Sequence, residues 1–258
     1  MFLEKIVEMK KEEIQRRKTR SRQKEMEEMI PSLPLPRDFM KAILQHPPMA
    51  VIAEIKRASP SLGAIKEDVD IIQVARAYEK GGAPAISVLT EAHFFKGDLS
   101  YLHLIKEKVS LPLLQKDFIL DPFQIYEGRV SGADAILLIA ALLGREELSD
   151  FADLAMSLHM TPLVEIHNEE DLEKTSFLHL PLIGINNRDL RTFQVDLRTT
   201  FRLRRGIPGR TKVISESGIK SLEDVRLLRK AGVDGILVGE ILMRSPDPAL
   251  KITELLEG

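Results

Sequence analysis

Cysteine is absent from the 258 residues of the chain. Its absence excludes disulfides, thiolate metal ligands and thiol nucleophiles together, and is typical of a protein in a reducing compartment. An excess of charge of one sign is also missing, because 37 Lys and Arg residues face 39 Asp and Glu residues. The charge balance therefore gives no indication of a nucleic-acid partner or a membrane surface.

Long apolar runs are missing too. No run approaches the roughly 18 residues of a membrane span, and the first residues lack the apolar core of a signal peptide. We therefore expect a cytoplasmic protein. Apolar residues still make up 44% of the chain and charged residues 29%, which is the balance of a globular protein with a sizeable core.

From residue 50 onward, short apolar runs alternate with amphipathic segments. We expect strands at 50–56, 85–89, 112–116, 134–139, 162–166, 181–185, 212–215 and 235–239. We expect helices at 69–81, 98–108, 121–131, 145–159, 168–175, 196–204, 221–231 and 247–256. Eight strands that are each followed by a helix predict a (βα)8 TIM barrel of the α/β class. A doubly wound open sheet is the alternative.

An internal repeat supports the barrel. The segments Gly82–Leu89, Gly132–Ile139 and Gly232–Val238 each begin with a glycine, continue through a small turn and end in an apolar strand. Their starts are separated by multiples of about 25 residues, and regular units of this kind indicate a repeat architecture. Similar helix-to-strand turns that arose independently are the alternative interpretation.

The first 30 residues are highly charged and only partly helical in their spacing. They contain a basic run at Arg16–Arg22, which is compatible with an arm that binds nucleic acid. Glutamates interrupt the basic residues throughout, so we expect a solvated helix instead.

Proline-rich residues Pro31–Pro36 end this helix and form a stiff connector. Asp38–Gln45 is then expected to add one or two helical turns. We expect a single domain, with residues 1–48 as an N-terminal helical extension and residues 49–258 as the barrel.

The stretch Ala53–Ser61 carries the first candidate site residues. Glu54 and Lys56 are two residues apart and therefore share one face of the first strand, at its end. The loop 59–63, with its hydroxyls and small residues, suits an anion. Two opposite charges at the end of an apolar strand cost folding free energy unless they form an ion pair with each other, and we interpret such a pair as functional. A solvated surface pair is the alternative.

Polar residues stand at the ends of other strands, where TIM barrels hold their active sites. They are Lys116 on the third strand, Glu165 on the fifth, Asn186 and Arg188 on the sixth, and Ser215 and Ser217 on the seventh. A structural salt bridge explains any single one of them. Two lysines, two glutamates and an asparagine from separate strands together predict a polar site at one mouth.

The last two strands predict an anion site. Ser217-Gly218 and Gly239-Glu240 each precede a helical segment, and the backbone N–H groups at a helix start favour phosphate. Barrels of this kind commonly bind phosphate between these two loops. A simple turn is the alternative for each glycine alone.

Metals and nucleotide cofactors have no support in the sequence. The histidines His46, His93, His103 and His167 lack metal-ligand spacing, and no Gly-rich dinucleotide or P-loop motif is present. We expect no cofactor and no metal.

Apolar residues near the ends of strands two to four are Phe94, Phe95, Phe118 and Leu137. They either belong to the core or line a pocket for a flat apolar group.

These motifs together resemble the indole-3-glycerol-phosphate synthase family over essentially the whole chain. The resemblance rests on Ala53–Ser61, Ser87–Glu91, Leu114–Ile119, Leu163–His167, Gly184–Leu190 and Ser215–Ile219. It implies that the N-terminal helical segment packs over the barrel mouth. It also implies a cofactor-free carboxy-lyase of tryptophan biosynthesis. The substrate would be an anthranilate N-linked to an open-chain deoxyribulose phosphate, and the indole ring would close with loss of carbon dioxide and water.

The resemblance also implies roles for the strand-end residues. Lys116 would be the general acid, with its pKa lowered from about 10.4 by Lys56 and by partial desolvation. Lys56 would also hold the substrate carboxylate, and Glu54 would orient Lys56. Glu165 would stabilise positive charge on the aniline nitrogen and accept its proton. Asn186 would bind a sugar hydroxyl.

The remaining implied contacts hold the two ends of the substrate. The phosphate would be held by Ser59, Ser217, Gly218, Gly239 and Glu240, and the aromatic ring by Phe95, Phe118, Leu137 and Leu237. Glu240 stands where some family members have serine, so it would bind through its N–H with its carboxylate turned away. Arg188 would bind an anion that we cannot assign.

Two other functions are open at this point. A phosphoribosylanthranilate isomerase uses a cysteine base, which this chain lacks. A non-catalytic binder of a phosphorylated metabolite would need the anion site but not both lysines and both glutamates. In either case we expect a monomer that binds a small phosphorylated aromatic molecule, without nucleic acid or membrane.

Overall fold

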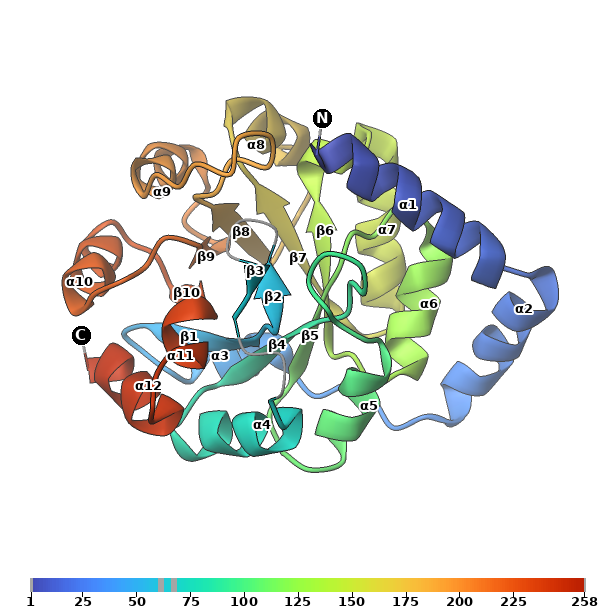
Figure 1. Ribbon diagram of the computed structural model, residues 1–258. Coiled ribbons are helices and arrows are strands. Elements are labelled where there is room, and N and C mark those ends of the chain that lie inside the picture. Colours follow the sequence, from blue (N-terminus) through green and yellow to red (C-terminus); the bar gives the residue numbers. More distant parts are fainter. Residues whose placement is uncertain (1, 60–62, 66–68, 258) are drawn as a thin grey trace.

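The computed structural model describes residues 2–59, 63–65 and 69–257. Within this part of the chain, eight parallel strands close into a barrel in the order β1-β10-β9-β8-β7-β6-β5-β4 (Figure 1). The strands are β1 (Ala50–Ile55), β4 (Ala85–Leu89), β5 (Leu113–Lys116), β6 (Ala135–Ile139), β7 (Thr161–Ile166), β8 (Leu182–Asn186), β9 (Lys212–Glu216) and β10 (Gly235–Val238). The predicted (βα)8 barrel is confirmed, and the open sheet is wrong.

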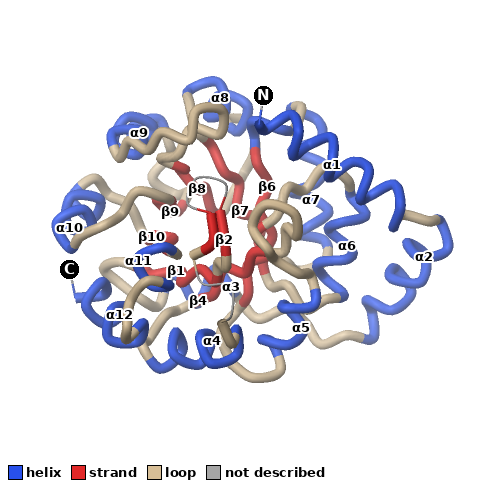
Figure 2. Tube along the Cα trace, in the orientation of Figure 1, coloured by secondary structure: helices blue, strands red, loops and turns tan. Residues whose placement is uncertain are grey.

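Helices surround the strands on the outside (Figure 2). The barrel helices are α4 (Ile71–Lys80), α5 (Ser100–Lys106), α6 (Pro122–Val130), α7 (Arg145–Ser157), α8 (Glu169–Thr175), α9 (Arg198–Leu203), α10 (Leu222–Lys230), α11 (Glu240–Met243) and α12 (Pro248–Glu257). Short 3₁₀ turns occur at η2 (Ala140–Leu142) and η3 (Arg204–Gly206). Among the described helices, none has the length and apolarity needed to cross a bilayer.

The three repeated glycines end helices in the way that the sequence predicts. Gly82, Gly132 and Gly232 have φ values of 84°, 99° and 78°, and each lies between a helix and the strand that follows it. This left-handed conformation is accessible to glycine at little cost. The repeat therefore marks the turn that returns the chain from the outer helix to the barrel.

A small antiparallel hairpin, β2 (Ala58–Ser59) with β3 (Gly63–Ala64), stands in the loop after β1 and was not predicted. Residues 60–62 lie outside the described residues. The predicted anion loop 59–63 is therefore described only at Ser59 and Gly63.

Side chains along each strand point alternately into and out of the barrel, so the apolar residues form two separate cores. Residues that point inward form one buried cluster inside the barrel, which includes Ile52, Leu114, Leu163 and Ile214. Residues that point outward pack between the strands and the helices. Because the inward positions continue in steps of two, each strand ends with a side chain directed into the mouth of the barrel.

The N-terminal extension divides into pieces with different positions. It consists of α1 (Phe2–Arg17), α2 (Arg20–Met29), the 3₁₀ turn η1 (Ile30–Ser32) and α3 (Phe39–Leu44). Phe39 and Ile43 of α3 join the interior cluster with Ala50 and Ala85, the first residues of β1 and β4. The extension therefore covers both ends of the barrel, with α3 at the floor and α1 at the mouth.

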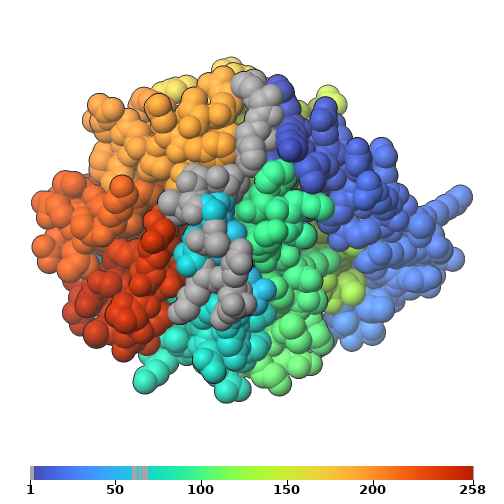
Figure 3. All heavy atoms as spheres, viewed as in Figure 1, coloured from blue at the N-terminus to red at the C-terminus, as the bar shows by residue number. Residues whose placement is uncertain are grey.

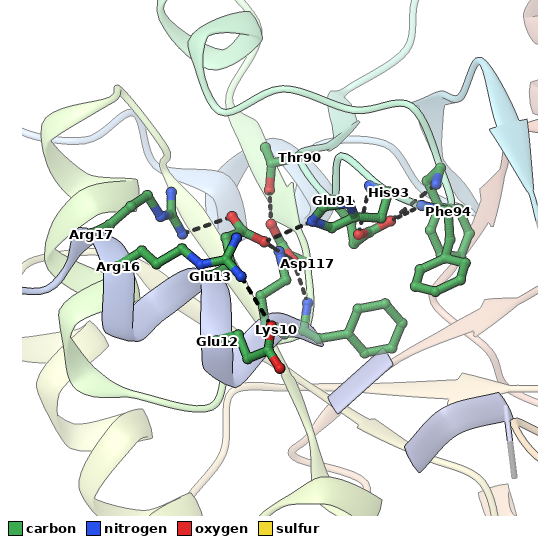
Figure 4. Close-up of polar contacts among 12 residues, drawn as sticks. Lys10, Glu12, Glu13, Arg16, Arg17, Thr90, Glu91, His93, Phe94 and Asp117 are labelled. Atoms are coloured by element: carbon green, nitrogen blue, oxygen red, sulfur yellow. Dashed lines mark hydrogen bonds and ion pairs between the residues drawn. The ribbon is translucent and has the colours of Figure 1, made fainter. Parts of the chain in front are cut away.

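The expectation of a simple solvated helix is wrong for α1. Lys10 is only 2% exposed, and its Nζ lies 2.9 Å from Asp117 Oδ1 and 3.0 Å from Glu13 Oε2 (Figure 4). Asp117 also accepts hydrogen bonds from the Thr90 hydroxyl at 2.6 Å and the Phe118 N–H at 2.8 Å. The first helix is thus fastened to the turn that follows β5.

The basic run also pairs with the barrel. Arg17 and Arg22 both contact the buried Glu127 of α6, at 3.4 and 3.1 Å, and Lys18 contacts Asp121 at 2.7 Å. These cations therefore hold the extension against α6, which explains the run without a nucleic-acid partner.

We expect Lys10→Met to lower the free energy of unfolding by about 3 kcal/mol, because it leaves the buried Asp117 carboxylate without its cation. Urea denaturation measures this loss. The matched control is Arg16→Met, since Arg16 pairs with Glu12 in an exposed i, i+4 contact and its loss should cost less than about 1 kcal/mol. Equal losses in the two variants would contradict the buried-pair interpretation.

Candidate active site

A cavity of about 630 Å³ opens where the strands end. Figure 3 views the molecule from this side, with α1 lying beside the segments that follow β4 and β5. All fifteen predicted site residues line this single cavity: Glu54, Lys56, Ser59, Phe95, Lys116, Phe118, Leu137, Glu165, Asn186, Arg188, Ser217, Gly218, Leu237, Gly239 and Glu240. Their shared location agrees with the geometry that the strand-end pattern predicts.

The centre of the cavity is a cluster of opposite charges. Lys116 Nζ lies 3.1 Å from Glu165 Oε2 and 3.3 Å from Glu216 Oε2, and both glutamates are about 1% exposed. Beside this group, Lys56 Nζ lies 2.7 Å from Glu54 Oε2. Two ammonium groups and three carboxylates from four strands thus meet at one mouth.

The pKa of Lys116 differs from the sequence-based expectation. Burial disfavours its charge, but the attraction of Glu165, Glu216 and Glu54 outweighs burial and raises its pKa above the ordinary value. The expected lowering by Lys56 and desolvation is therefore wrong for this state of the site. The error arose because the sequence did not reveal how many carboxylates surround this lysine.

The two glutamates beside Lys116 shift in opposite directions. Burial raises the pKa of Glu216 to about 8, and the neighbouring Glu165 adds to that rise against the attraction of Lys116. Burial also acts on Glu165, but Lys116 and His167 overcome it and hold its pKa far below the usual range.

Glu216 was missed by the sequence analysis, which took Ser215 as the inward residue of its strand. Ser215 instead faces outward, where its hydroxyl contacts Asn187 and Thr200. Ile214 belongs to the barrel interior, so the step of two places Glu216 inward as well. Ser217 still reaches the cavity because its φ of 64° turns the chain just after the strand.

Two glycines make room for the carboxylates. A Cβ on Gly239 would lie 2.5 Å from Glu54 Oε2, and a Cβ on Gly184 would overlap Glu216 Oε1. Real Cβ atoms do not tolerate such contacts. The adjacent strands β10 and β8 therefore carry glycine where these side chains cross the barrel.

The predicted anion site has a different local structure from the one expected. Ser217 and Gly218 are consecutive left-handed residues, with φ values of 64° and 83°, and α10 begins only at Leu222. They form a turn, so the prediction that they stand at a helix start is wrong. Gly239 does directly precede α11, and the Glu240 carboxylate turns toward Arg244, 3.2 Å away.

An apolar wall completes the cavity. The rings of Phe95 and Phe118 lie 6.2 Å apart at an angle of 44°, and Leu3 and Ile6 of α1 line the cavity with them. Glu91 accepts hydrogen bonds from three successive backbone N–H groups, ending with that of Phe95, and so fixes the loop after β4 (Figure 4).

Phe94, the neighbouring ring considered in the sequence, packs against the interior cluster and is not part of the cavity lining.

The sixth strand supplies polar groups at the same mouth. Asn186 Oδ1 accepts the backbone N–H of Arg188 at 3.0 Å, and the Arg188 guanidinium donates to the Phe193 carbonyl at 3.2 Å. Within residues 2–59, 63–65 and 69–257, no group of three or more His, Asp or Glu side chains is arranged to hold a metal ion.

The barrel mouth combines the left-handed turn Ser217-Gly218, an apolar wall, and paired lysines and glutamates. In a closed (βα)8 barrel these features define an enzyme for a phosphorylated substrate. A family profile described as Indole-3-glycerol phosphate synthase matches residues 3–255. The chain belongs to the indole-3-glycerol phosphate synthase family, whose members are carboxy-lyases of tryptophan biosynthesis.

Relatives with this name are similar over their full length. The synthase of Desulforamulus reducens is 47% identical over 256 residues, which cover 99% of this chain and 97% of that protein. The synthase of Acetivibrio thermocellus is also 47% identical over 256 residues, with 98% of each chain covered.

Solved structures with little sequence identity share the fold. A 3-hexulose-6-phosphate synthase matches with a TM-score of 0.62 at 14% identity, over 81% of this chain and 99% of that one. A thiamine phosphate pyrophosphorylase from Pyrococcus furiosus matches with a TM-score of 0.58 at 16% identity, over 83% and 96%. At such identities the similarity supports the fold alone.

Proposed function

We propose that the chain converts 1-(2-carboxyphenylamino)-1-deoxyribulose 5-phosphate into indole-3-glycerol phosphate. The ring carbon that bears the carboxylate attacks the ketone carbon, the carboxylate leaves as carbon dioxide, and the former ketone oxygen leaves as water. The observation that carries this proposal is the meeting of Lys116 with Glu165 and Glu216 in the cavity. The reaction needs an acid for the oxygen and a base for the proton lost from the carbon next to the aniline nitrogen, and this cluster holds both.

Lys116 serves as the acid in this proposal. Its raised pKa keeps it protonated at neutral pH, so it gives up its proton only to a strongly basic oxygen such as the alkoxide that forms in the attack. Glu216, with its pKa of about 8, then returns a proton to the lysine for the departure of water.

Glu165 serves as the anion that faces the aniline nitrogen. Because its pKa lies well below the ordinary value, it remains charged while positive charge develops on that nitrogen. It then takes the proton that the carbon attached to the nitrogen loses as the indole ring becomes aromatic. Lys56, paired with Glu54, holds the substrate carboxylate until it leaves, and Asn186 binds a sugar hydroxyl.

The ends of the substrate fit the two sides of this cluster. Backbone N–H groups of the turn and of the loop after β10 hold the phosphate, from Ser217, Gly218, Gly239 and Glu240, with Ser59 beside them. Phe95, Phe118, Leu137 and Leu237 enclose the aromatic ring. The Glu240 carboxylate points toward Arg244, which keeps its negative charge away from the anion site. This orientation supports phosphate binding by the Glu240 N–H. Arg188 adds a cation near the same mouth.

The appearance of indole fluorescence on incubation with the carboxyphenylamino deoxyribulose phosphate tests the proposal. The chain contains no tryptophan, so the protein itself contributes no indole fluorescence to the product signal. We expect multiple turnovers without added cofactor. A non-catalytic binder would bind the substrate and leave the indole signal at the uncatalysed rate, and that result would refute the proposed reaction.

We also propose that the protein acts as a cytoplasmic monomer. The absence of cysteine supports a reducing compartment, and all of the proposed substrate contacts come from one chain. Light scattering at micromolar concentration tests the monomer, and a mass of twice 29.1 kDa would contradict it.

A further inference from the structure

His167 lies directly behind the central cluster and has no part in the roles given above. It follows Glu165 by two residues at the end of β7, and its side chain is 9% exposed. Its Nε2 lies 3.2 Å from Glu165 Oε1, the carboxylate oxygen that does not face Lys116. His167 does not line the cavity, so it acts on the site only through Glu165.

A second carboxylate holds the other side of the ring. His167 Nδ1 lies 3.5 Å from Asp171 Oδ2, and the same oxygen accepts the backbone N–H of His167 at 3.0 Å. Asp171 is itself fixed at the start of α8, where its N–H donates to the Asn168 side chain at 2.9 Å. Each ring nitrogen thus faces a carboxylate oxygen, and only the imidazolium form presents a proton to both.

Lys116 contacts both glutamates, and among the described residues it donates a hydrogen bond to Glu165 but not to Glu216. Its contacts to Glu165 and Glu216 differ by only a few tenths of an ångström, at 3.1 and 3.3 Å, and both carboxylates are fully buried. Two such carboxylates around one ammonium share a proton, and the site must fix which of them carries it. His167 contacts Glu165 and does not contact Glu216 among the ion pairs of the described residues.

We propose that His167 is a positioning residue whose imidazolium makes Glu165 the ionised glutamate and Glu216 the protonated one. This assignment rests on the proposed function, because it gives each glutamate the state that ring closure requires. The proton of His167 stays on the ring throughout. Its charge attracts the Glu165 carboxylate, whose other oxygen remains next to Lys116.

The electrostatics of the surrounding elements agree with this arrangement. Burial lowers the pKa of His167, but Asp171 and Glu165 outweigh it and raise the pKa to about 9. The other charged groups of the cluster are Lys116 from β5, Glu216 from β9, Glu54 from β1 and Lys56, which follows β1 and pairs with Glu54. Because the pKa is raised, the charged ring is present at neutral pH and is lost as the pH rises through about 9.

Kinetics of His167→Asn provide the first test. The substitution removes the cation and keeps a small polar side chain, so we expect kcat to fall about tenfold while KM changes less than twofold. The acid limb of the kcat profile should move to higher pH, because Glu165 then binds a proton more readily. His103→Asn is the matched control, since His103 lies exposed on α5 beside Glu107. An unchanged kcat profile in His167→Asn would overturn the proposal.

A double-variant cycle separates proton placement from a purely structural role. In a Glu216→Gln background the competing carboxyl is gone, so we expect the loss of His167 to move the acid limb less than it does in the parent. Equal shifts in both backgrounds would mean that His167 does not set the proton between the two glutamates.

Imidazole NMR of the unsubstituted protein tests the charge without any turnover. The sequence has six histidines, and the His167 signal is identified by its absence from His167→Asn. We expect that signal to titrate near 9, and at lower pH in Asp171→Asn. A midpoint near the ordinary 6.5 would overturn the proposal even if the enzyme is active. A high midpoint in a protein without indole formation would refute the reaction and leave the imidazolium established.

Discussion

Replacing Lys116 by alanine is expected to lower kcat by about 10²–10⁴-fold, the range for loss of a general acid. The substitution removes the only cation that lies between Glu165 and Glu216 in the described contacts. Without the attraction of the lysine, Glu165 would bind a proton more readily, so the base would be weakened while the acid is lost. Initial rates of indole fluorescence at saturating substrate measure the effect, and circular dichroism checks that the barrel is folded.

Lys108→Ala is the matched control for this variant, because Lys108 pairs with Glu107 on the surface, away from the mouth. We expect its kcat to remain within about twofold of the parent. Near-normal turnover in a folded Lys116→Ala protein would mean that another group protonates the ketone oxygen.

Glu165→Gln is expected to reduce kcat by a similar factor, about 10²–10⁴-fold. Glutamine keeps the shape of the side chain but carries no charge, so the developing cation on the aniline nitrogen loses its counter-ion. Lys116 and His167, which now face the two Glu165 oxygens, would meet a neutral amide instead. Stopped-flow fluorescence under single-turnover conditions measures the chemical step directly, free of product release.

The control here is Glu127→Gln, another glutamate that is buried and paired with cations. Glu127 lies on α6 under the N-terminal extension, so its loss should affect stability and leave kcat near the parent value. A fall in kcat as large as that of Glu165→Gln would point to general loss of structure. Retained kcat in Glu165→Gln would remove the base from the proposed mechanism.

The architecture and the positions of the site residues could be predicted because they follow from short-range patterns. Glycine at the ends of α4, α6 and α10 marks the return to the barrel, and a polar residue at the end of an apolar strand marks the mouth. Steps of two along the first strand gave Glu54 and Lys56 a common direction, and both line the cavity. Their roles in the chemistry remain predictions for the variants above to test.

Other features depend on contacts between distant segments, and no local pattern contains them. The sequence prediction chose the wrong inward-facing residues for β9, because it took Ser217 to continue the strand. Ser217 lies beyond the strand, and its left-handed backbone changes the direction of the side chain. The pKa of Lys116 follows from three carboxylates on three other strands, which only the closed barrel brings together. Lys10 resembles any exposed lysine in a charged helix until Asp117 is placed beside it.

The pairing of Lys10 with Asp117 has a consequence for synthesis on the ribosome. Translation releases α1 first, while its partner emerges only after β4, α5 and β5 have been made. Until then the Lys10 ammonium has no carboxylate of the barrel to join and stays hydrated, because burying it alone is prohibitively costly. The first helix therefore cannot bury Lys10 against the barrel until Asp117 has been made, by which time nearly half of the chain has been translated.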